Sequence, residues 1–99
     1  MIYCIDVDGT LCDETCNVGY EYAQPNQAMI DEVNRLYDEG HTIKIWTARG
    51  QMTGIDWEQF TKQQLSTWGV KYHEYHKKTS GDFYVDDKAM TPEDFLKRK

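Results

Sequence analysis

The first ten residues constrain the fold more than any other stretch of the chain. Residues 2–5, IYCI, form a short and nearly continuous apolar run, and the acidic sequence DVDGT follows at once. An uninterrupted apolar run of this length is typical of a parallel strand that is covered on both faces. The chain is therefore expected to carry Asp6 and Asp8 at the carboxyl end of a central strand.

Strand-like and helix-like segments alternate along the rest of the chain. Their β-branched and aromatic content predicts strands at residues 2–5, 42–46, 70–75 and 83–85. Apolar residues spaced three to four apart predict helices at residues 25–39, at residues 56–68 and from residue 92 onward. This alternation is typical of an α/β fold, here a Rossmann-like three-layer sandwich with a central parallel sheet. Residues 11–24 are expected to form a loop.

Cap and turn residues fix the expected ends of the helices. Pro25 suits the first turn of the first helix, and Gly40 suits the position just after its end. Asp56 is expected to cap the second helix. Thr91 and Pro92 are expected to cap and begin the last helix.

Length and charge limit the classes of function. The chain has 99 residues, which predicts one domain spanning residues 1–99. It carries 11 Lys and Arg against 17 Asp and Glu, a formal net charge of -6. That balance argues against a nucleic-acid partner, which needs a basic face. No apolar run approaches a membrane span, so a membrane partner is not expected either.

The N-terminus and the cysteines predict a cytoplasmic protein. Asp6 and Asp8 interrupt the apolar run that a signal peptide would need. Cys4, Cys12 and Cys16 make an odd number, which is typical of reduced thiols in a cytoplasm. They do not show the four-ligand spacing of a structural zinc site.

Polar residues follow each predicted strand at its carboxyl end, where parallel sheets bind ligands. These groups are Asp6 and Asp8, then Thr47, Ala48 and Arg49, then Lys77 and Lys78, and last Asp86 and Asp87. Each group alone is ordinary loop composition. Together they predict one site at one edge of the sheet.

Electrostatics predicts which ligands this site takes. Two ionised carboxylates about 4 Å apart repel by roughly 4 kcal/mol at an effective dielectric constant of 20. A hard divalent cation such as Mg²⁺ would relieve that repulsion. Gly9 and Thr10 add backbone N–H groups in a tight turn that can cradle an anion. Arg49 and Lys78 add positive charge, so the site is expected to bind a phosphate.

These motifs, in this order, resemble the haloacid dehalogenase superfamily of phosphatases. The shared features are DVDGT after an N-terminal strand, a strand-end threonine, a lysine and a DD pair. More narrowly, YAQPN, GHTIKIWTARG, WEQFTKQQL and FYVDDKAM resemble small bacterial phosphatases found with capsule and surface-polysaccharide genes. The resemblance implies a fold of that superfamily without an inserted cap domain.

The resemblance also implies roles for residues. Asp6 would be the nucleophile that forms an aspartyl-phosphate, and Asp8 the general acid and base. Gly9, Thr10, Thr47, Ala48, Arg49 and Lys78 would bind the phosphate. Asp6, the backbone carbonyl of Asp8, Asp86 and Asp87, the last directly or through water, would hold Mg²⁺. The substrate would be a small phosphorylated metabolite, with a sugar phosphate as the first expectation.

Several alternatives stay open on the sequence. Lys77 or Lys71 could replace Lys78 as the phosphate-facing lysine. The enzyme could be a nucleotidase or a phosphotransferase, and a catalytically silent phosphate-binding domain is the rival from another class. Because no cap domain covers the site, either a large substrate or a homo-oligomer could complete it.

Overall fold

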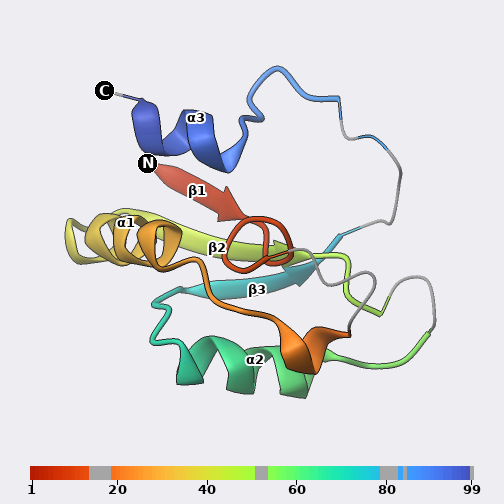
Figure 1. Ribbon diagram of the computed structural model, residues 1–99. Helices are drawn as coiled ribbons and strands as arrows, with labels where there is room; N and C mark the ends of the chain where they lie inside the picture. Colours follow the sequence, from red (N-terminus) through yellow and green to blue (C-terminus); the bar gives the residue numbers. More distant parts are fainter. Residues whose placement is uncertain (14–18, 51–53, 79–82, 84, 99) are drawn as a thin grey trace.

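A parallel sheet organises the structure. The computed structural model describes residues 1–13, 19–50, 54–78, 83 and 85–98. Its strands are β1 (Ile2–Ile5), β2 (Thr42–Thr47) and β3 (Glu74–Lys77), which form a three-stranded sheet in the order β1-β2-β3 (Figure 1). Both pairings are parallel. The expected α/β fold with a parallel sheet is confirmed at this level.

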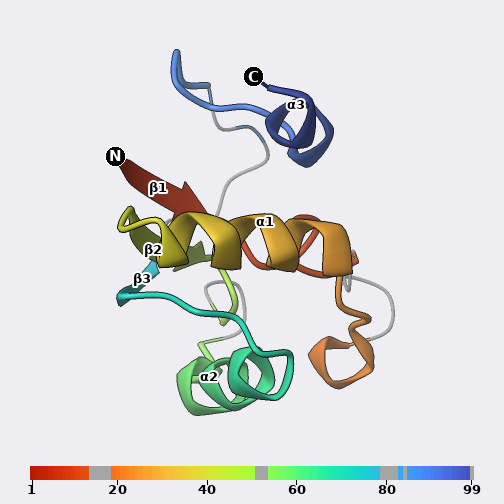
Figure 2. The same cartoon turned by 90° about the vertical axis from the view of Figure 1, so that its left-hand side faces the viewer.

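The helices connect and flank these strands. They are α1 (Gln27–Asp38), α2 (Glu58–Thr67) and α3 (Pro92–Lys97), with a short 3-10 helix η1 (Tyr20–Tyr22) before α1. Figure 1 shows α3 beside β1, and Figure 2 shows α1 and α2 on the same side of the sheet. Within the described ranges, no helix has the length and apolar character needed to cross a membrane.

One face of the sheet packs into the core and the other is open. Ile5, Ile43 and Ile45 are buried, as is the face of α1 that carries Met29, Ile30, Val33 and Leu36. Ile2 and Trp46, on the opposite face, are 64% and 41% exposed. Strand residues alternate between the two faces, so this burial pattern shows one covered face. The expectation that the first strand is covered on both faces is therefore wrong for the described residues.

The first two helices begin later than their sequences predicted. Pro25 precedes the cap of α1, and the Asn26 side chain accepts a hydrogen bond from the Met29 N–H at 3.3 Å. Asp56 accepts from the Glu58 N–H at 3.0 Å, but Trp57 occupies the cap position of α2. In both cases a residue nearer the helix takes the cap position, which flanks the first fully helical residue.

The other expected helix ends agree with the structure. Gly40 follows the C-terminal cap of α1 with φ 96°, a left-handed conformation that glycine adopts at low cost. The Thr91 hydroxyl accepts from the Asp94 N–H at 3.1 Å, and Pro92 begins α3.

The third and fourth predicted strands differ from the structure. Val70 donates its N–H to the Leu65 carbonyl, and the Asn34 side chain binds the backbone on both sides of Val70. These bonds end α2 and delay β3 to Glu74. Phe83 and Val85 are exposed and lie outside the sheet, and residue 84 lies outside the described residues.

An ion-pair cluster fastens α3 to α1. Glu32 accepts hydrogen bonds from Arg98 at 3.0 Å and from Arg35 at 2.7 Å. The hydrogen bond from Arg35, with help from Arg98, lowers the pKa of Glu32 from 4.5 to about 2. The folded state thus holds Glu32 ionised at pH values where the unfolded chain protonates it.

A Glu32→Gln variant should show the pH dependence of this cluster. Because the folded-state pKa lies below the ordinary value, the stabilisation is fully present above pH 4.5 and is lost as the pH falls toward 2. We expect the variant to lower the free energy of unfolding by about 1 kcal/mol at pH 7. Urea denaturation at pH 7 and at pH 3 measures the difference. A difference that stays the same at pH 3 would contradict the account.

Candidate active site

Asp6 and Lys78 form the centre of the candidate site. Asp6 follows β1 and Lys78 follows β3, so both lie at the carboxyl edge of the sheet. The Lys78 Nζ lies 3.4 Å from the Asp6 Oδ1, and that oxygen also accepts the Val7 N–H at 2.8 Å. Burial raises the pKa of the Asp6 carboxyl, while the Lys78 charge opposes that rise. The result is a half-buried carboxylate held by a lysine.

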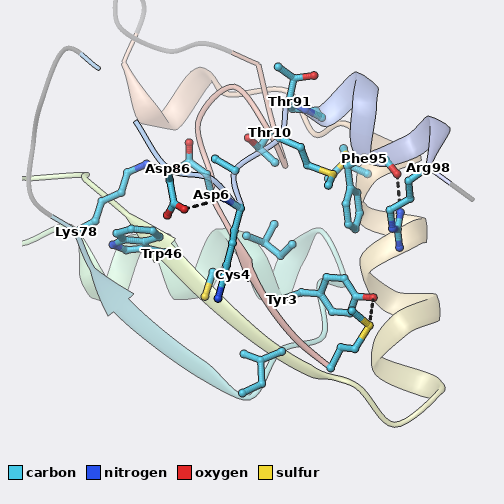
Figure 3. Close-up of a pocket in the computed structure, with 18 residues that line it drawn as sticks. Tyr3, Cys4, Asp6, Thr10, Trp46, Lys78, Asp86, Thr91, Phe95 and Arg98 are labelled. Carbon is cyan, nitrogen blue, oxygen red and sulfur yellow. Dashed lines mark hydrogen bonds and ion pairs between the residues drawn. The ribbon is translucent and has the colours of Figure 1, made fainter. Parts of the chain in front are cut away.

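A pocket of about 720 Å³ opens beside this pair. Asp6, Thr10, Lys78 and Asp86 line it together. In Figure 3, Asp6, Lys78, Asp86 and Trp46 gather at one end of the pocket, and Phe95 and Arg98 lie at the other. Asp86 is exposed, and its carboxylate accepts the Lys88 N–H at 2.8 Å, which lowers its pKa. Asp6 and Lys78, which follow β1 and β3, thus share one pocket, as the strand-end pattern predicted, and Asp86 joins them although Phe83 and Val85 before it lie outside the sheet.

Asp8 has a different surrounding from Asp6. The Arg49 Nε donates to the Asp8 Oδ2 at 3.0 Å, and the Arg49 Nη2 donates to the Asp8 Oδ1 at 2.8 Å. Such a two-point pair fixes the orientation of both groups. Asp8 is not among the residues that line the pocket of Asp6.

Arg49 is buried rather than open to substrate. Its side chain is 0% exposed, and it also donates to the Thr61 hydroxyl at 3.2 Å and to the Gln64 side-chain oxygen at 2.7 Å. The Tyr20 ring packs against the guanidinium, and the Arg49 Cζ lies 4.4 Å from the ring centroid. The phosphate contact expected of Arg49 therefore has no counterpart in this geometry. Thr61 and Gln64 were not predicted to belong to this region.

Thr47, Ala48 and the Gly9 turn have structural roles in this arrangement. The Thr47 hydroxyl is buried and accepts the Arg49 N–H at 3.2 Å, and Ala48 is the half-buried residue between them. Gly9 has φ 82°, which lets the chain turn sharply after Asp8. The Thr10 N–H donates to the Val7 carbonyl at 3.2 Å, so this N–H closes the turn instead of facing a phosphate.

Two basic side chains weaken the argument that a metal must relieve the repulsion between Asp6 and Asp8. Asp6 faces Lys78 and Asp8 faces Arg49, so a metal is not needed to relieve repulsion between these two carboxylates. The described residues contain no group of three or more His, Cys, Asp or Glu side chains that could hold a metal ion. Mg²⁺ commonly uses only one or two carboxylates and keeps several waters. The oxygen donors of Asp6 and Asp86 in one pocket fit that requirement.

The three candidate lysines lie in different places. Lys78 contacts Asp6, as described above. Lys71 binds Asp38 at 2.9 Å on the surface, and Lys77 is an exposed residue of β3.

Asp87 is exposed beside Asp86 and is not among the pocket-lining residues. Cys12 is buried, with a pKa raised to about 12 mainly by burial, and Cys16 lies outside the described residues.

The buried pair of Arg49 and Asp8 leads to a prediction about stability. Replacing Arg49 with Met removes the guanidinium that binds Asp8 and leaves Thr61 and Gln64 without this donor. We expect the free energy of unfolding to fall by about 2 kcal/mol, less than for a fully buried pair because the Asp8 side chain is 23% exposed and can regain water. Urea denaturation measures this, with the exposed Lys71→Met as control. Equal losses in both variants would contradict the account.

Two solved structures resemble the chain. A crystal structure of a target protein from Vibrio cholerae matches with a TM-score of 0.87 and 25% identity, over 99% of this chain and 89% of that one. A structure of a Pnkp1/Rnl/Hen1 complex matches with a TM-score of 0.62 and 19% identity, over 96% of this chain but only 33% of the other. No family model and no curated protein matches. The two likenesses support the α/β fold.

Proposed function

We propose that the chain is a Mg²⁺-dependent phosphatase that acts through an aspartyl-phosphate on Asp6. The proposal includes the finer fold, a Rossmann-like domain of the haloacid dehalogenase type without an inserted cap. The observation that carries it is the Asp6–Lys78 contact at the carboxyl edge of the sheet, with Asp86 in the same pocket. A carboxylate, a cation and a second carboxylate around one cavity are the groups that phosphoryl transfer by an aspartate needs.

The reaction would proceed in two displacements at phosphorus. The Asp6 Oδ forms a bond to phosphorus as the bond from phosphorus to the substrate oxygen breaks, and that oxygen takes a proton to leave as the alcohol. Water then attacks the aspartyl-phosphate, loses a proton, and releases inorganic phosphate and free Asp6. Lys78 balances the negative charge of the transferring phosphoryl group. Mg²⁺ held by Asp6 and Asp86 would supply further charge neutralisation.

The role of Asp8 follows from the resemblance. As general acid and base it would give a proton to the leaving oxygen and later take one from water. In the structure its carboxylate is bound to Arg49 and lies outside the Asp6 pocket, so this role requires Asp8 to turn toward the substrate.

The same observation supports a second candidate function. A domain whose Asp8 stays bound to Arg49 would bind Mg²⁺ and phosphate without hydrolysing an ester. Turnover separates the two functions, because only the phosphatase releases phosphate. A phosphotransferase would instead pass the phosphoryl group to an added acceptor alcohol in preference to water, and a nucleotidase would favour nucleotides over other phosphates.

A screen of phosphorylated metabolites tests the proposal. Sugar phosphates come first because of the resemblance, with nucleotides and p-nitrophenyl phosphate beside them. We expect phosphate release in Mg²⁺, its loss on addition of EDTA, and its return when Mg²⁺ is restored in excess. Binding of Mg²⁺ and phosphate with no release from any compound would favour the silent domain. Release that EDTA does not affect would contradict the metal requirement.

A further inference from the structure

Trp46 lies on the open face of the sheet next to the candidate active site. Its neighbours Ile45 and Thr47 are buried at 0% and 1% exposure, whereas Trp46 is 41% exposed. This alternation follows from the strand geometry of β2. The pairing of Ile5 with Ile45 places Trp46 alongside Asp6, the residue that directly follows β1.

A single lysine connects the indole to the reacting carboxylate. The Lys78 Nζ lies 5.5 Å from the centroid of the Trp46 ring and 3.4 Å from the Asp6 Oδ1. Figure 3 shows the three side chains together at one end of the pocket. A phosphate that contacts Asp6 and Lys78 would therefore bring the rest of its molecule alongside the indole.

Apolar side chains also line the pocket, beyond the charged end at which the indole lies. Ile2, Cys4 and Met90 line the same pocket, and Ile2 and Met90 are 64% and 55% exposed. Arg98, at the far end, is already bound to Glu32. The cavity of about 720 Å³ has room for far more than a phosphate. A flat aromatic ring could stack on the exposed face of the indole, and stacking of this kind needs no hydrogen-bonding group on the ring.

We propose that Trp46 forms a stacking subsite for an aromatic ring carried by the alcohol portion of a phosphate monoester. The inference rests on the proposed phosphatase function and refines its substrate class. The expected substrate is then an aromatic phosphate ester and not a sugar phosphate, which only the resemblance supports. Trp46 takes no part in bond making, so its effect is on which alcohol the enzyme releases.

Three phosphate esters of primary alcohols distinguish the effect of an aromatic ring in the substrate from the effect of the leaving oxygen. Benzyl phosphate, cyclohexylmethyl phosphate and glucose 6-phosphate have the same type of leaving oxygen and differ in the group beside it. We expect kcat/KM for benzyl phosphate to exceed each of the other two by about tenfold. Glucose 6-phosphate as the best of the three substrates would overturn the proposal.

Substitution of Trp46 tests whether the indole causes that preference. In Trp46→Leu the ratio of benzyl to cyclohexylmethyl phosphate should fall from about ten to near one, and Trp46→Phe should keep part of it. Phe60→Leu is the matched control, because Phe60 is a partly exposed aromatic residue of α2 outside the pocket, and it should keep the ratio. An unchanged ratio in Trp46→Leu would overturn the subsite.

Binding measurements keep the two proposals distinguishable. If the wild-type chain releases phosphate from none of the esters in Mg²⁺, the phosphatase proposal fails. Calorimetric titration with benzyl phosphate then decides the subsite, which stands if Trp46→Leu weakens binding about tenfold and falls if it does not. If Trp46→Leu instead turns a dimer into a monomer in light scattering and leaves the ratio unchanged, the indole covers a second copy of the chain and the subsite is overturned.

Discussion

An Asp6→Asn variant should lose turnover of p-nitrophenyl phosphate in Mg²⁺ by about 10³-fold or more. The amide is a poor nucleophile toward phosphorus, so the variant cannot form the covalent intermediate. The change keeps the size of the side chain and keeps an oxygen that can accept the Val7 N–H, as the carboxylate does at 2.8 Å. The effect should therefore appear in kcat and leave the fold intact.

Two measurements make the Asp6 test specific. Thermal unfolding shows whether Asp6→Asn remains folded, and steady-state kinetics with added Mg²⁺ shows whether activity is lost. A folded variant with wild-type rates would show that Asp6 is not the nucleophile. If Asp6→Asn fails to fold, Asp6→Glu takes its place in the test. This variant should also lose most activity, because the longer side chain displaces the attacking oxygen.

A Lys78→Met variant should lower kcat/KM by about 100-fold. The Lys78 ammonium is 3.4 Å from the Asp6 carboxylate, so its positive charge lies close to where the phosphoryl group would transfer. Removing one preorganised charge of this kind typically costs two orders of magnitude or more. Methionine preserves most of the apolar stem, so the loss should come from the missing charge.

Lys71→Met is the matched control for this variant. Lys71 binds Asp38 on the surface, with 49% of its side chain exposed, and should change kcat/KM by less than about twofold. A loss in Lys71→Met as large as in Lys78→Met would assign the effect to overall charge. If Lys78→Met keeps the wild-type kcat/KM, Lys77 becomes the candidate for the phosphate-facing lysine.

The local patterns of the sequence predicted much of the fold. The apolar runs predicted β1, which buries Ile5, and β2, which buries Ile43 and Ile45, and Thr91 with Pro92 predicted the start of α3. The third strand was displaced because the Asn34 side chain binds the backbone near Val70, a contact between residues far apart in sequence. Periodicity within one segment carries no information about such a contact.

The candidate site, too, could be predicted from local sequence patterns only in part. The position of polar residues after parallel strands predicted that Asp6 and Lys78 share one region, because β1 and β3 end at one edge. Asp86 lines the same pocket, although Phe83 and Val85 before it lie outside the sheet. The strand-end pattern did not predict that Arg49 turns inward to Asp8, Thr61 and Gln64, since that direction depends on where α2 packs. The outward direction of the Trp46 indole, by contrast, is a local property, because side chains alternate between the two faces along a strand.

The mass of acid-quenched enzyme tests the central claim most directly. The wild-type chain is mixed with p-nitrophenyl phosphate and Mg²⁺, quenched in acid during turnover, and digested for mass spectrometry. The account predicts the added mass of one phosphoryl group on the N-terminal peptide that contains Asp6, and none in Asp6→Asn treated alike. An active enzyme with the phosphoryl group on another residue, or one that retains it in Asp6→Asn, would contradict the account.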